Sequence, residues 1–220
     1  MIFAKRRVFM IRVMLLGDSV RMFYQEKTKE ILGENYEVWS PKENCRFSLY
    51  LLNSLRFYLA EFPSPDIIHF NAGLWDTAVL YKCDGCFASA DEYVRNMKKI
   101  LRELKKTGAK IIFATTTPVA DEKYKLDGPM PPAHRNGDII SYNRAVLDAF
   151  KDEDIVINDL HALIYPDREK YISDDMIHPN EDGINVLGER VANVIKQQNI
   201  TGKNVGIESR KLVLDEKTVQ

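Results

Sequence analysis

The stretch Ile11–Ser19, IRVMLLGDS, is an apolar run that ends in Gly-Asp-Ser. A short apolar run with a glycine directly after it is typical of a buried strand that turns sharply at its end. The residues Val20–Leu32 then have a helical pattern, and Gly33 is a typical residue to end that helix. The sequence therefore predicts a strand, a tight turn and a helix, with a serine where the helix begins.

The rest of the chain continues this alternation of strands and helices. Further strands are expected at Tyr36–Trp39, Asp66–Phe70, Lys110–Ala114 and Ile155–Ile157, and further helices at Phe47–Leu59, Ser89–Lys106, Asp138–Phe150, Leu160–Ile164 and Glu181–Gln197. Residues 119–137 form a long loop that contains Pro and Gly. Because strands that alternate with helices indicate βαβ units, we predict an α/β fold with a five-stranded parallel sheet.

Composition and charge limit the classes of function. The 220 residues are 45% hydrophobic and 29% charged, which is typical of one soluble globular domain, and we place that domain at residues 10–200. The net charge is -1, so we expect no nucleic-acid partner. No stretch approaches the ~20 apolar residues of a membrane span, so we expect no membrane partner and a cytoplasmic location.

The two ends of the chain stand apart from this domain. Residues 1–9 are basic and precede Met10, so they are a candidate leader. Residues 201–220 form a C-terminal tail, in which Lys211–Leu214 suits an edge strand, a partner contact or a loosely ordered segment. The sequence leaves open whether the chain forms a homo-oligomer.

The chain has three cysteines: Cys45, Cys83 and Cys86. An odd count in a chain with no export signal argues against a disulfide framework. The pair Cys83 and Cys86 forms a lone CxxC. A zinc site needs about four ligands, and no second pair is present. We therefore favour a turn with two reduced thiols over a metal site.

In an open parallel sheet, reactive groups gather at the carboxyl ends of the strands. Ser19 follows the first strand and begins a helix, where its backbone N–H has no partner within the helix. That N–H is suited to stabilise an oxyanion while the hydroxyl acts as a nucleophile. The alternative is that Asp18 or Ser19 only caps the helix.

Asp175 and His178 form a D-x-x-H pattern before the last helix. A histidine can take the proton of a serine near neutral pH, and a carboxylate on its other nitrogen fixes its orientation. The alternative is an ordinary loop histidine. His69, His134 and His161 have no such partner, and we expect His69 to be a satisfied core residue.

Taken together, these motifs resemble the GDSL, or SGNH, hydrolase family. The resemblance rests on the strand–GDS–helix start, a G-x-x-D turn after the third strand and the late D-x-x-H, and it extends over Ile11–Lys196. It implies a catalytic triad of Ser19, Asp175 and His178. It also implies a flavodoxin-like three-layer α/β/α sandwich, and no metal or organic cofactor.

Two positions depart from the family pattern. The family's third block is Gly-x-Asn-Asp, whereas this chain has Gly73, then Leu74, Trp75 and Asp76, so Trp75 stands where the oxyanion-binding Asn is expected. The glycine of the second block is also missing from residues 39–48. The candidate oxyanion and substrate-binding residues are therefore as follows: Asn44, Asn71, Gly73, Trp75 and Asp76.

The predicted function is that of a serine ester hydrolase that forms an acyl-enzyme and removes a short acyl group, such as acetyl, from a carbohydrate or similar small-molecule ester. Candidate rim residues that suit a sugar ring are Trp75, Tyr24, Tyr81, His134 and Arg135. A lysophospholipase or thioesterase is one alternative. A non-catalytic carbohydrate-binding protein on the same fold is another. A nucleotide- or flavin-binding protein is disfavoured because the chain has no GxGxxG or P-loop motif.

Overall fold

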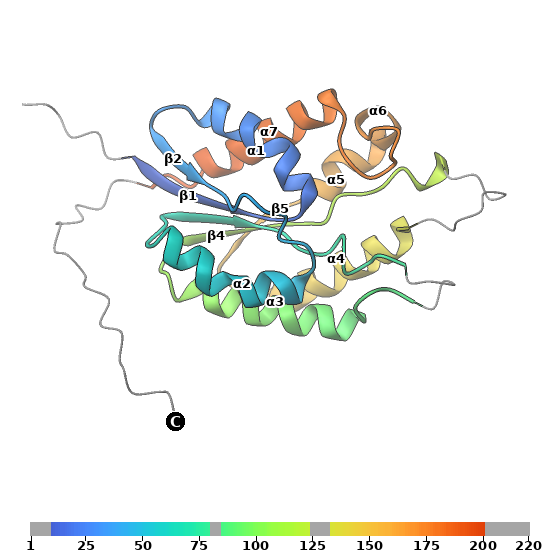
Figure 1. The fold of residues 1–220 in the computed structure, drawn as a ribbon, viewed down its shortest axis with the longest axis horizontal. Helices are drawn as coiled ribbons and strands as arrows, with labels where there is room; N and C mark the ends of the chain where they lie inside the picture. Colours follow the sequence, from blue (N-terminus) through green and yellow to red (C-terminus); the bar gives the residue numbers. More distant parts are fainter. Residues whose placement is uncertain (1–9, 80–84, 124–132, 201–220) are drawn as a thin grey trace, which may run out of the picture.

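The computed structural model describes residues 10–79, 85–123 and 133–200. Its centre is one sheet of five parallel strands: β1 (Ile11–Leu16), β2 (Tyr36–Trp39), β3 (Ile67–Phe70), β4 (Lys110–Ala114) and β5 (Val156–Asn158). Their order in the sheet is β2-β1-β3-β4-β5, and every neighbouring pair is parallel (Figure 1). The predicted five-stranded parallel sheet is confirmed.

The predicted leader, the tail, Tyr81 and Cys83 lie outside the described residues.

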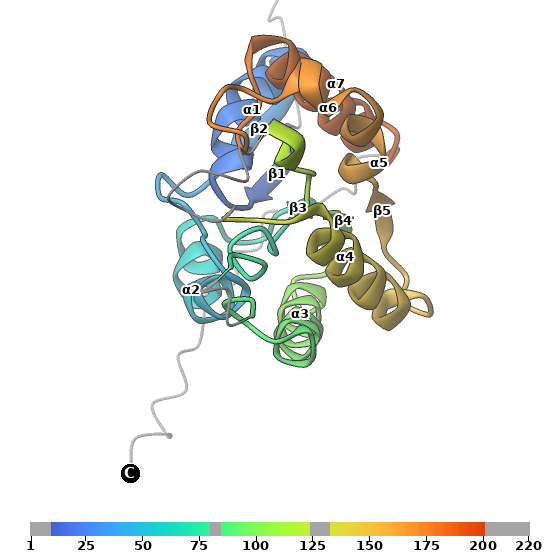
Figure 2. The ribbon, with the colours of Figure 1, turned by 90° about the vertical axis from the view of Figure 1, so that its right-hand side faces the viewer.

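Helices cover both faces of this sheet. They are α1 (Ser19–Leu32), α2 (Ser48–Glu61), α3 (Ala90–Lys105), α4 (Asn136–Phe150), α5 (Leu160–Ile164), α6 (Arg168–Tyr171) and α7 (Glu181–Lys196), with short 3-10 turns at η2 (Asp121–Lys123) and η3 (Tyr165–Asp167). Figure 2 shows α1, α6 and α7 on one face and α2, α3 and α4 on the other. The result is the predicted three-layer α/β/α sandwich. The turns η2 and η3 and the one-turn helix α6 were not predicted, because such short segments carry no hydrophobic period.

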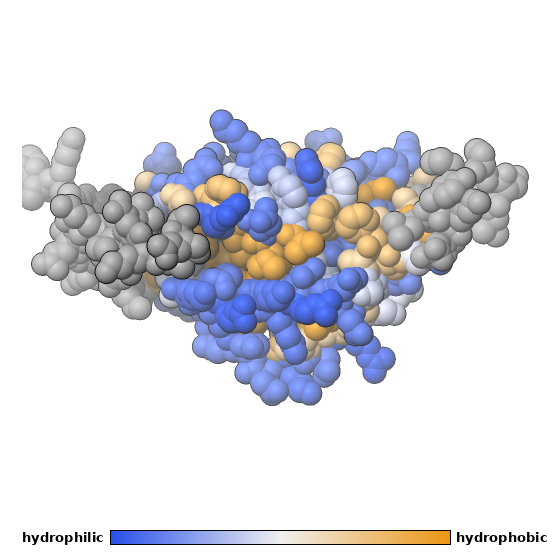
Figure 3. Space-filling model, turned by 60° about the horizontal axis from the view of Figure 1, so that its bottom comes forward, coloured by the Kyte–Doolittle hydropathy of each residue, from blue (hydrophilic) through white to orange (hydrophobic). Residues whose placement is uncertain are grey.

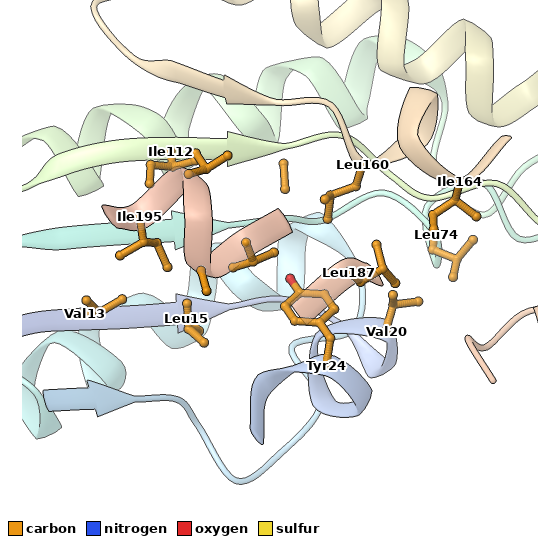
Figure 4. Close-up of a cluster of buried hydrophobic side chains, with 14 of the residues drawn as sticks. Val13, Leu15, Val20, Tyr24, Leu74, Ile112, Leu160, Ile164, Leu187 and Ile195 are labelled. Carbon is orange, nitrogen blue, oxygen red and sulfur yellow. The ribbon is translucent and has the colours of Figure 1, made fainter. Parts of the chain in front are cut away.

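Alternation along the strands builds two cores, one on each face of the sheet. Successive side chains of a strand point to opposite faces. Val13 and Leu15 of β1 therefore pack with α1 and α7 (Figure 4), whereas Met14 and Leu16 pack with α2 and α3. All four side chains are fully buried.

The α2 face leaves apolar side chains at the surface. Leu49 and Phe57 are 56% and 57% exposed. A groove beside them is lined by Leu52, Leu59 and Glu103, among others. Figure 3 shows apolar side chains gathered on this side of the molecule, bordered by hydrophilic ones. These side chains stay exposed because α2 is apolar on more than one face, and only one face can pack against the sheet.

His69 of β3 lies in the core, as expected, but it is not fully satisfied. The Asn158 side-chain amide donates to His69 Nε2 at 3.2 Å, whereas Nδ1 has no hydrogen-bond partner among the residues that the structure describes. Burial lowers the pKa of His69 to about 3, so the ring is neutral at neutral pH.

The first and last long helices approach each other closely at Gly188 of α7. A Cβ at this position would lie 2.8 Å from Lys27 Cβ and 3.3 Å from the Thr28 backbone nitrogen on α1. The Thr28 hydroxyl also lies 3.4 Å from the Gly188 carbonyl. Glycine is thus required by helix packing rather than by a turn.

We therefore expect Gly188→Ala to lower stability, although alanine is the better helix former by roughly 1 kcal/mol. The added methyl group forces α1 and α7 apart, and overpacking of this kind costs about 1–3 kcal/mol. Urea unfolding measures the change. Gly137→Ala is the matched control, because a Cβ at Gly137 in α4 meets nothing within 4 Å. Equal effects of the two substitutions would contradict the packing argument.

Candidate active site

Ser19 lies at the carboxyl edge of β1, the edge that faces the viewer in Figure 2. The preceding Asp18 caps α1, since its side chain accepts from the Val20 backbone N–H at 3.0 Å. Part of the alternative interpretation is therefore correct: Asp18 is an N-cap. Ser19 is not, and its hydroxyl is free for other contacts.

That hydroxyl meets His178. Ser19 Oγ lies 2.7 Å from His178 Nε2, although the two residues are 159 positions apart. On the other side of the ring, His178 Nδ1 lies 2.6 Å from Asp175 Oδ2. An ionised carboxylate can only accept, so Nδ1 carries the proton and Nε2 is left to accept from the serine. The structure brings the three predicted triad residues into one hydrogen-bonded chain.

The D-x-x-H segment folds back on Asp175. Asp175 Oδ1 accepts from the backbone N–H of Ile177 at 2.9 Å and of His178 at 2.8 Å, and from the Ser173 hydroxyl at 2.8 Å. Met176 has a φ of 67°, which is uncommon for a residue with a side chain and makes this tight turn possible. Burial alone would raise the pKa of Asp175, but these hydrogen bonds and the one from the His178 ring outweigh it and hold the pKa well below its ordinary value. Asp175 is therefore ionised at neutral pH.

Neighbouring segments hold His178 in place. Its carbonyl accepts from the Ser173 N–H at 2.8 Å, and the Ala120 N–H, after β4, donates to the Met176 carbonyl at 2.9 Å. The ring of Phe23, on α1, stacks on the imidazole with centroids 4.9 Å apart. Backbone bonds within the turn and from the loop after β4 thus hold the segment that carries His178, and Phe23 packs on its ring.

Asn44 lies beside the Ser19 turn. The next residue, Cys45, donates its N–H to the Gly17 carbonyl at 3.2 Å. The Asn44 side-chain oxygen accepts from the Arg46 N–H at 2.7 Å, so the side chain folds back on its own loop. Within the described residues, neither the Asn44 backbone N–H nor the Ser19 backbone N–H donates a hydrogen bond. The Ser19 turn and the loop that is bonded to it thus each carry one unpaired backbone donor.

Asn71 and Asp76 are used differently from what the sequence analysis expected. The Asn71 amide donates to the Ala114 carbonyl at 2.8 Å. Asp76 accepts from the Ser48 N–H at 2.9 Å and from its hydroxyl at 2.5 Å, which fastens the start of α2. Both side chains are buried, Asn71 at 8% and Asp76 at 1% exposure. These bonds join elements of the scaffold, and we leave both residues out of the oxyanion set.

Gly73 and Trp75 occupy the turn after β3. Gly73 has a φ of 149°, and a Cβ there would lie 2.3 Å from the Thr116 hydroxyl oxygen, so only glycine fits. The Trp75 side chain is 41% exposed, and its indole N–H makes no hydrogen bond within the described residues. Among the third-block residues, Trp75 is the one whose side-chain donor has no partner in the described part of the chain.

The sequence matches no protein-family model, and no curated protein matches it significantly. Solved structures do match. A GDSL-like lipase from Bacteroides thetaiotaomicron VPI-5482 is 18% identical, with a TM-score of 0.67 over 89% of this chain and 93% of that one. The lipase/acylhydrolase from Enterococcus faecalis is 17% identical, with a TM-score of 0.68 over 86% and 97% of the two chains. A serine-to-alanine catalytic mutant of an acetylxylan esterase from Geobacillus stearothermophilus is 15% identical, with a TM-score of 0.66 over 84% and 93%. The chain has the SGNH hydrolase fold.

The residues predicted to line the rim of the site and to bind a sugar ring differ from one another in burial. Tyr24 is only 1% exposed and belongs to the core between α1 and α7 (Figure 4), so its assignment to the rim was wrong. Arg135 is exposed. His134 is 8% exposed, and its Nδ1 has no hydrogen-bond partner in the described part of the chain. Burial, with a smaller contribution from the charge of His178, lowers the pKa of His134 to about 4, so its ring stays neutral at neutral pH.

We found no candidate metal site in the described part of the chain. Residues 10–79, 85–123 and 133–200 contain no group of three or more His, Cys, Asp or Glu side chains that could hold a metal ion. Cys86 is a free thiol, while its CxxC partner lies outside these ranges. None of the helices in the described part of the chain is long and apolar enough to cross a membrane.

Asp18, the buried N-cap of α1, gives a test of the electrostatics next to Ser19. Burial raises the pKa of Asp18 from 3.8 to about 6. A raised carboxyl pKa means that the folded state holds its proton more tightly than the unfolded state. The wild type therefore loses stability as the pH rises from about 4 to about 6.

Asp18→Asn keeps a good cap but has no proton to lose. We expect the stability of the variant relative to wild type to increase across this pH window by up to ~3 kcal/mol, at 1.36 kcal/mol per pKa unit. Urea unfolding of both proteins between about pH 4 and pH 7 measures this difference, in which the other titrating groups cancel. A difference that does not change with pH would show that Asp18 titrates alike in both states.

Proposed function

We propose that the protein is a serine ester hydrolase that works through an acyl-Ser19 intermediate. The observation that carries the proposal is the chain from Ser19 Oγ to His178 Nε2 at 2.7 Å and from His178 Nδ1 to Asp175 at 2.6 Å. A serine hydroxyl becomes a useful nucleophile when a base within hydrogen-bond reach takes its proton. The esterases and lipases that share the SGNH hydrolase fold support the same class of reaction.

Acylation begins when Ser19 Oγ attacks the carbonyl carbon of the ester and His178 Nε2 takes the hydroxyl proton. Asp175 stays ionised, holds the ring by its Nδ1–H and stabilises the imidazolium. The imidazolium then gives its proton to the leaving alcohol oxygen as the carbon–oxygen bond breaks. Deacylation repeats these steps with water as the nucleophile, which releases the acid and restores the Ser19 hydroxyl.

The tetrahedral intermediate carries a negative oxygen that needs hydrogen-bond donors. We assign this role to the backbone N–H groups of Ser19 and Asn44. Both are unpartnered within the described residues, which supports the assignment. The Ser19 N–H also belongs to the first turn of α1, where the helix dipole favours negative charge.

For the substrate, we propose a short acyl ester of a carbohydrate. Acetylxylan esterases are among the proteins with this fold. Phe23, which stacks on His178, is 44% exposed, and Trp75 is 41% exposed. Exposed aromatic faces suit a sugar ring, and neutral His134 offers a polar group near the base without opposing its charge.

Ser19→Ala should abolish turnover of p-nitrophenyl acetate, with a loss of at least about 10³-fold, because no acyl-enzyme can form. Initial rates from p-nitrophenol absorbance measure the loss. Ser141→Ala is the matched control, since the Ser141 hydroxyl, on the exposed side of α4, bonds the Gly137 carbonyl and no other group of the described residues. Turnover retained by Ser19→Ala, with an unchanged unfolding curve, would contradict the proposal.

Acyl length separates the proposed substrate from the alternatives. We expect kcat/KM to be highest for p-nitrophenyl acetate, lower for butyrate and lowest for octanoate, and we expect acetate release from acetylated xylan. An apolar acyl channel would instead gain about 0.8 kcal/mol for each CH₂ that it buries. A preference for octanoate would therefore favour the lysophospholipase or thioesterase alternative. Sugar binding without turnover of any ester would favour the non-catalytic one.

A further inference from the structure

Arg21 is a buried cation two positions after the serine that begins α1. Its side chain is only 1% exposed, and it makes five hydrogen bonds. Nε and Nη2 donate to the Gly17 carbonyl at 3.4 and 3.3 Å, Nη1 donates to the Pro41 carbonyl at 3.0 Å and to the Gln25 side chain, and Nη2 donates to the Glu43 carbonyl at 2.7 Å. A guanidinium has five N–H donors, so all of them are used.

The backbone acceptors of Arg21 belong to two segments that meet at the site. Gly17 is in the turn before the serine, and Pro41 and Glu43 are in the loop after β2. Gly17 suits this contact because a Cβ there would lie 2.8 Å from Arg21 Cβ. Arg21 thus ties the nucleophile turn to the loop that carries Asn44.

The bond to the Glu43 carbonyl also determines where the Asn44 N–H points. That carbonyl and the Asn44 N–H belong to the same peptide group, which is trans and planar, so they point in opposite directions. The following peptide is held as well, since the Cys45 N–H donates to Gly17. Asn44 is fixed on both sides, with its N–H directed away from the guanidinium.

The same loop is also fixed from α2. The Glu43 carboxylate accepts from the Tyr50 hydroxyl at 2.7 Å and from the Tyr58 hydroxyl at 2.8 Å. The carbonyl of Glu43 is thus held from α1, and its carboxylate is held from α2. Rotation of the peptide between Glu43 and Asn44 would break the contact with Arg21.

We propose that Arg21 is a positioning residue of the oxyanion hole, which orients and polarises the Glu43–Asn44 peptide so that the Asn44 N–H receives the negative oxygen. A cation on the carbonyl end of a peptide strengthens the donor at its other end. The acceptors of Arg21 within the described residues are three backbone carbonyls and a glutamine side chain, so no carboxylate neutralises its charge by direct contact. The inference rests on the proposed esterase function.

Arg21→Gln and Arg21→Lys test the inference. Glutamine keeps a donor but removes the charge, and lysine keeps the charge but cannot span three carbonyls. Loss of one oxyanion donor lowers kcat by about 10²–10³-fold, and we expect a fall of this size for Arg21→Gln and a smaller one for Arg21→Lys. KM for p-nitrophenyl acetate should change less than about 3-fold, because the donor acts on the transition state.

Arg12→Gln is the matched control. Arg12 of β1 also donates to a backbone carbonyl, that of Pro63, and to Glu37, and within the described residues it bonds no residue of the site. A fluorophosphonate reacts covalently with the activated serine, so the labelled fraction counts the correctly folded molecules. Each rate is divided by this fraction. If Arg21→Gln does not fold, Arg21→Lys supplies the comparison.

Affinity for a boronic acid gives a readout that a purely structural role would not change. Boronates add to the serine oxygen and form a tetrahedral anion, so their inhibition constant should rise in proportion to the fall in kcat. Unchanged kcat in the Arg21 variants, or a lower kcat with unchanged boronate affinity, would overturn the inference alone. Absence of ester turnover in the wild type would overturn the proposed function, and with it the inference.

Discussion

The close packing of α1 against α7 is what allows Ser19 and His178 to meet. Ser19 begins α1, and His178 stands just before α7, so the relative position of these two helices sets the separation of the two side chains. A contact of 2.7 Å between residues 159 positions apart tolerates little error in that packing. Gly188 lets the two helix backbones approach, and the buried side chains between them, such as Tyr24 and Leu187, keep them in register.

Two carboxyl groups near the serine have opposite electrostatic environments. Asp18 is almost fully buried and has a raised pKa, whereas Asp175 is partly exposed and has a lowered one. The difference follows first from burial, which raises the pKa of Asp18 and is offset there by only one backbone hydrogen bond. Asp175 is less buried, and two backbone and two side-chain hydrogen bonds outweigh the effect of burial on its pKa. In the proposed mechanism, only a carboxylate that stays ionised can hold His178 in the required tautomer. Asp175 therefore suits this role, and Asp18 suits the role of cap.

The sequence predicted those features that depend on neighbouring residues. The strands followed from apolar runs, and Ser19 and His178 followed from the residues beside them. The role of Asp76 could not be predicted, because its partner Ser48 lies 28 positions away and becomes a neighbour only in the folded chain. Arg21 was missed for a similar reason: an arginine on a helix is usually exposed, and its acceptors are backbone carbonyls, which the sequence does not distinguish.

The chain lacks the asparagine of the family's third block and the glycine of its second block. Both departures are compatible with catalysis if the oxyanion donors are backbone N–H groups. A side-chain donor, such as the Asn that Trp75 replaces, depends on the identity of one residue. A backbone N–H is present at almost every residue, and what it needs is a fixed peptide orientation. The missing glycine and asparagine therefore shift the requirement from the donor to the residues that hold it. In the mechanism that we propose, those residues are Arg21 on one side of the loop and Glu43, held by two tyrosines, on the other. Under this proposal, Asn44 serves as the second donor because its peptide is fixed, and its side chain, which folds back onto the Arg46 N–H, takes no part.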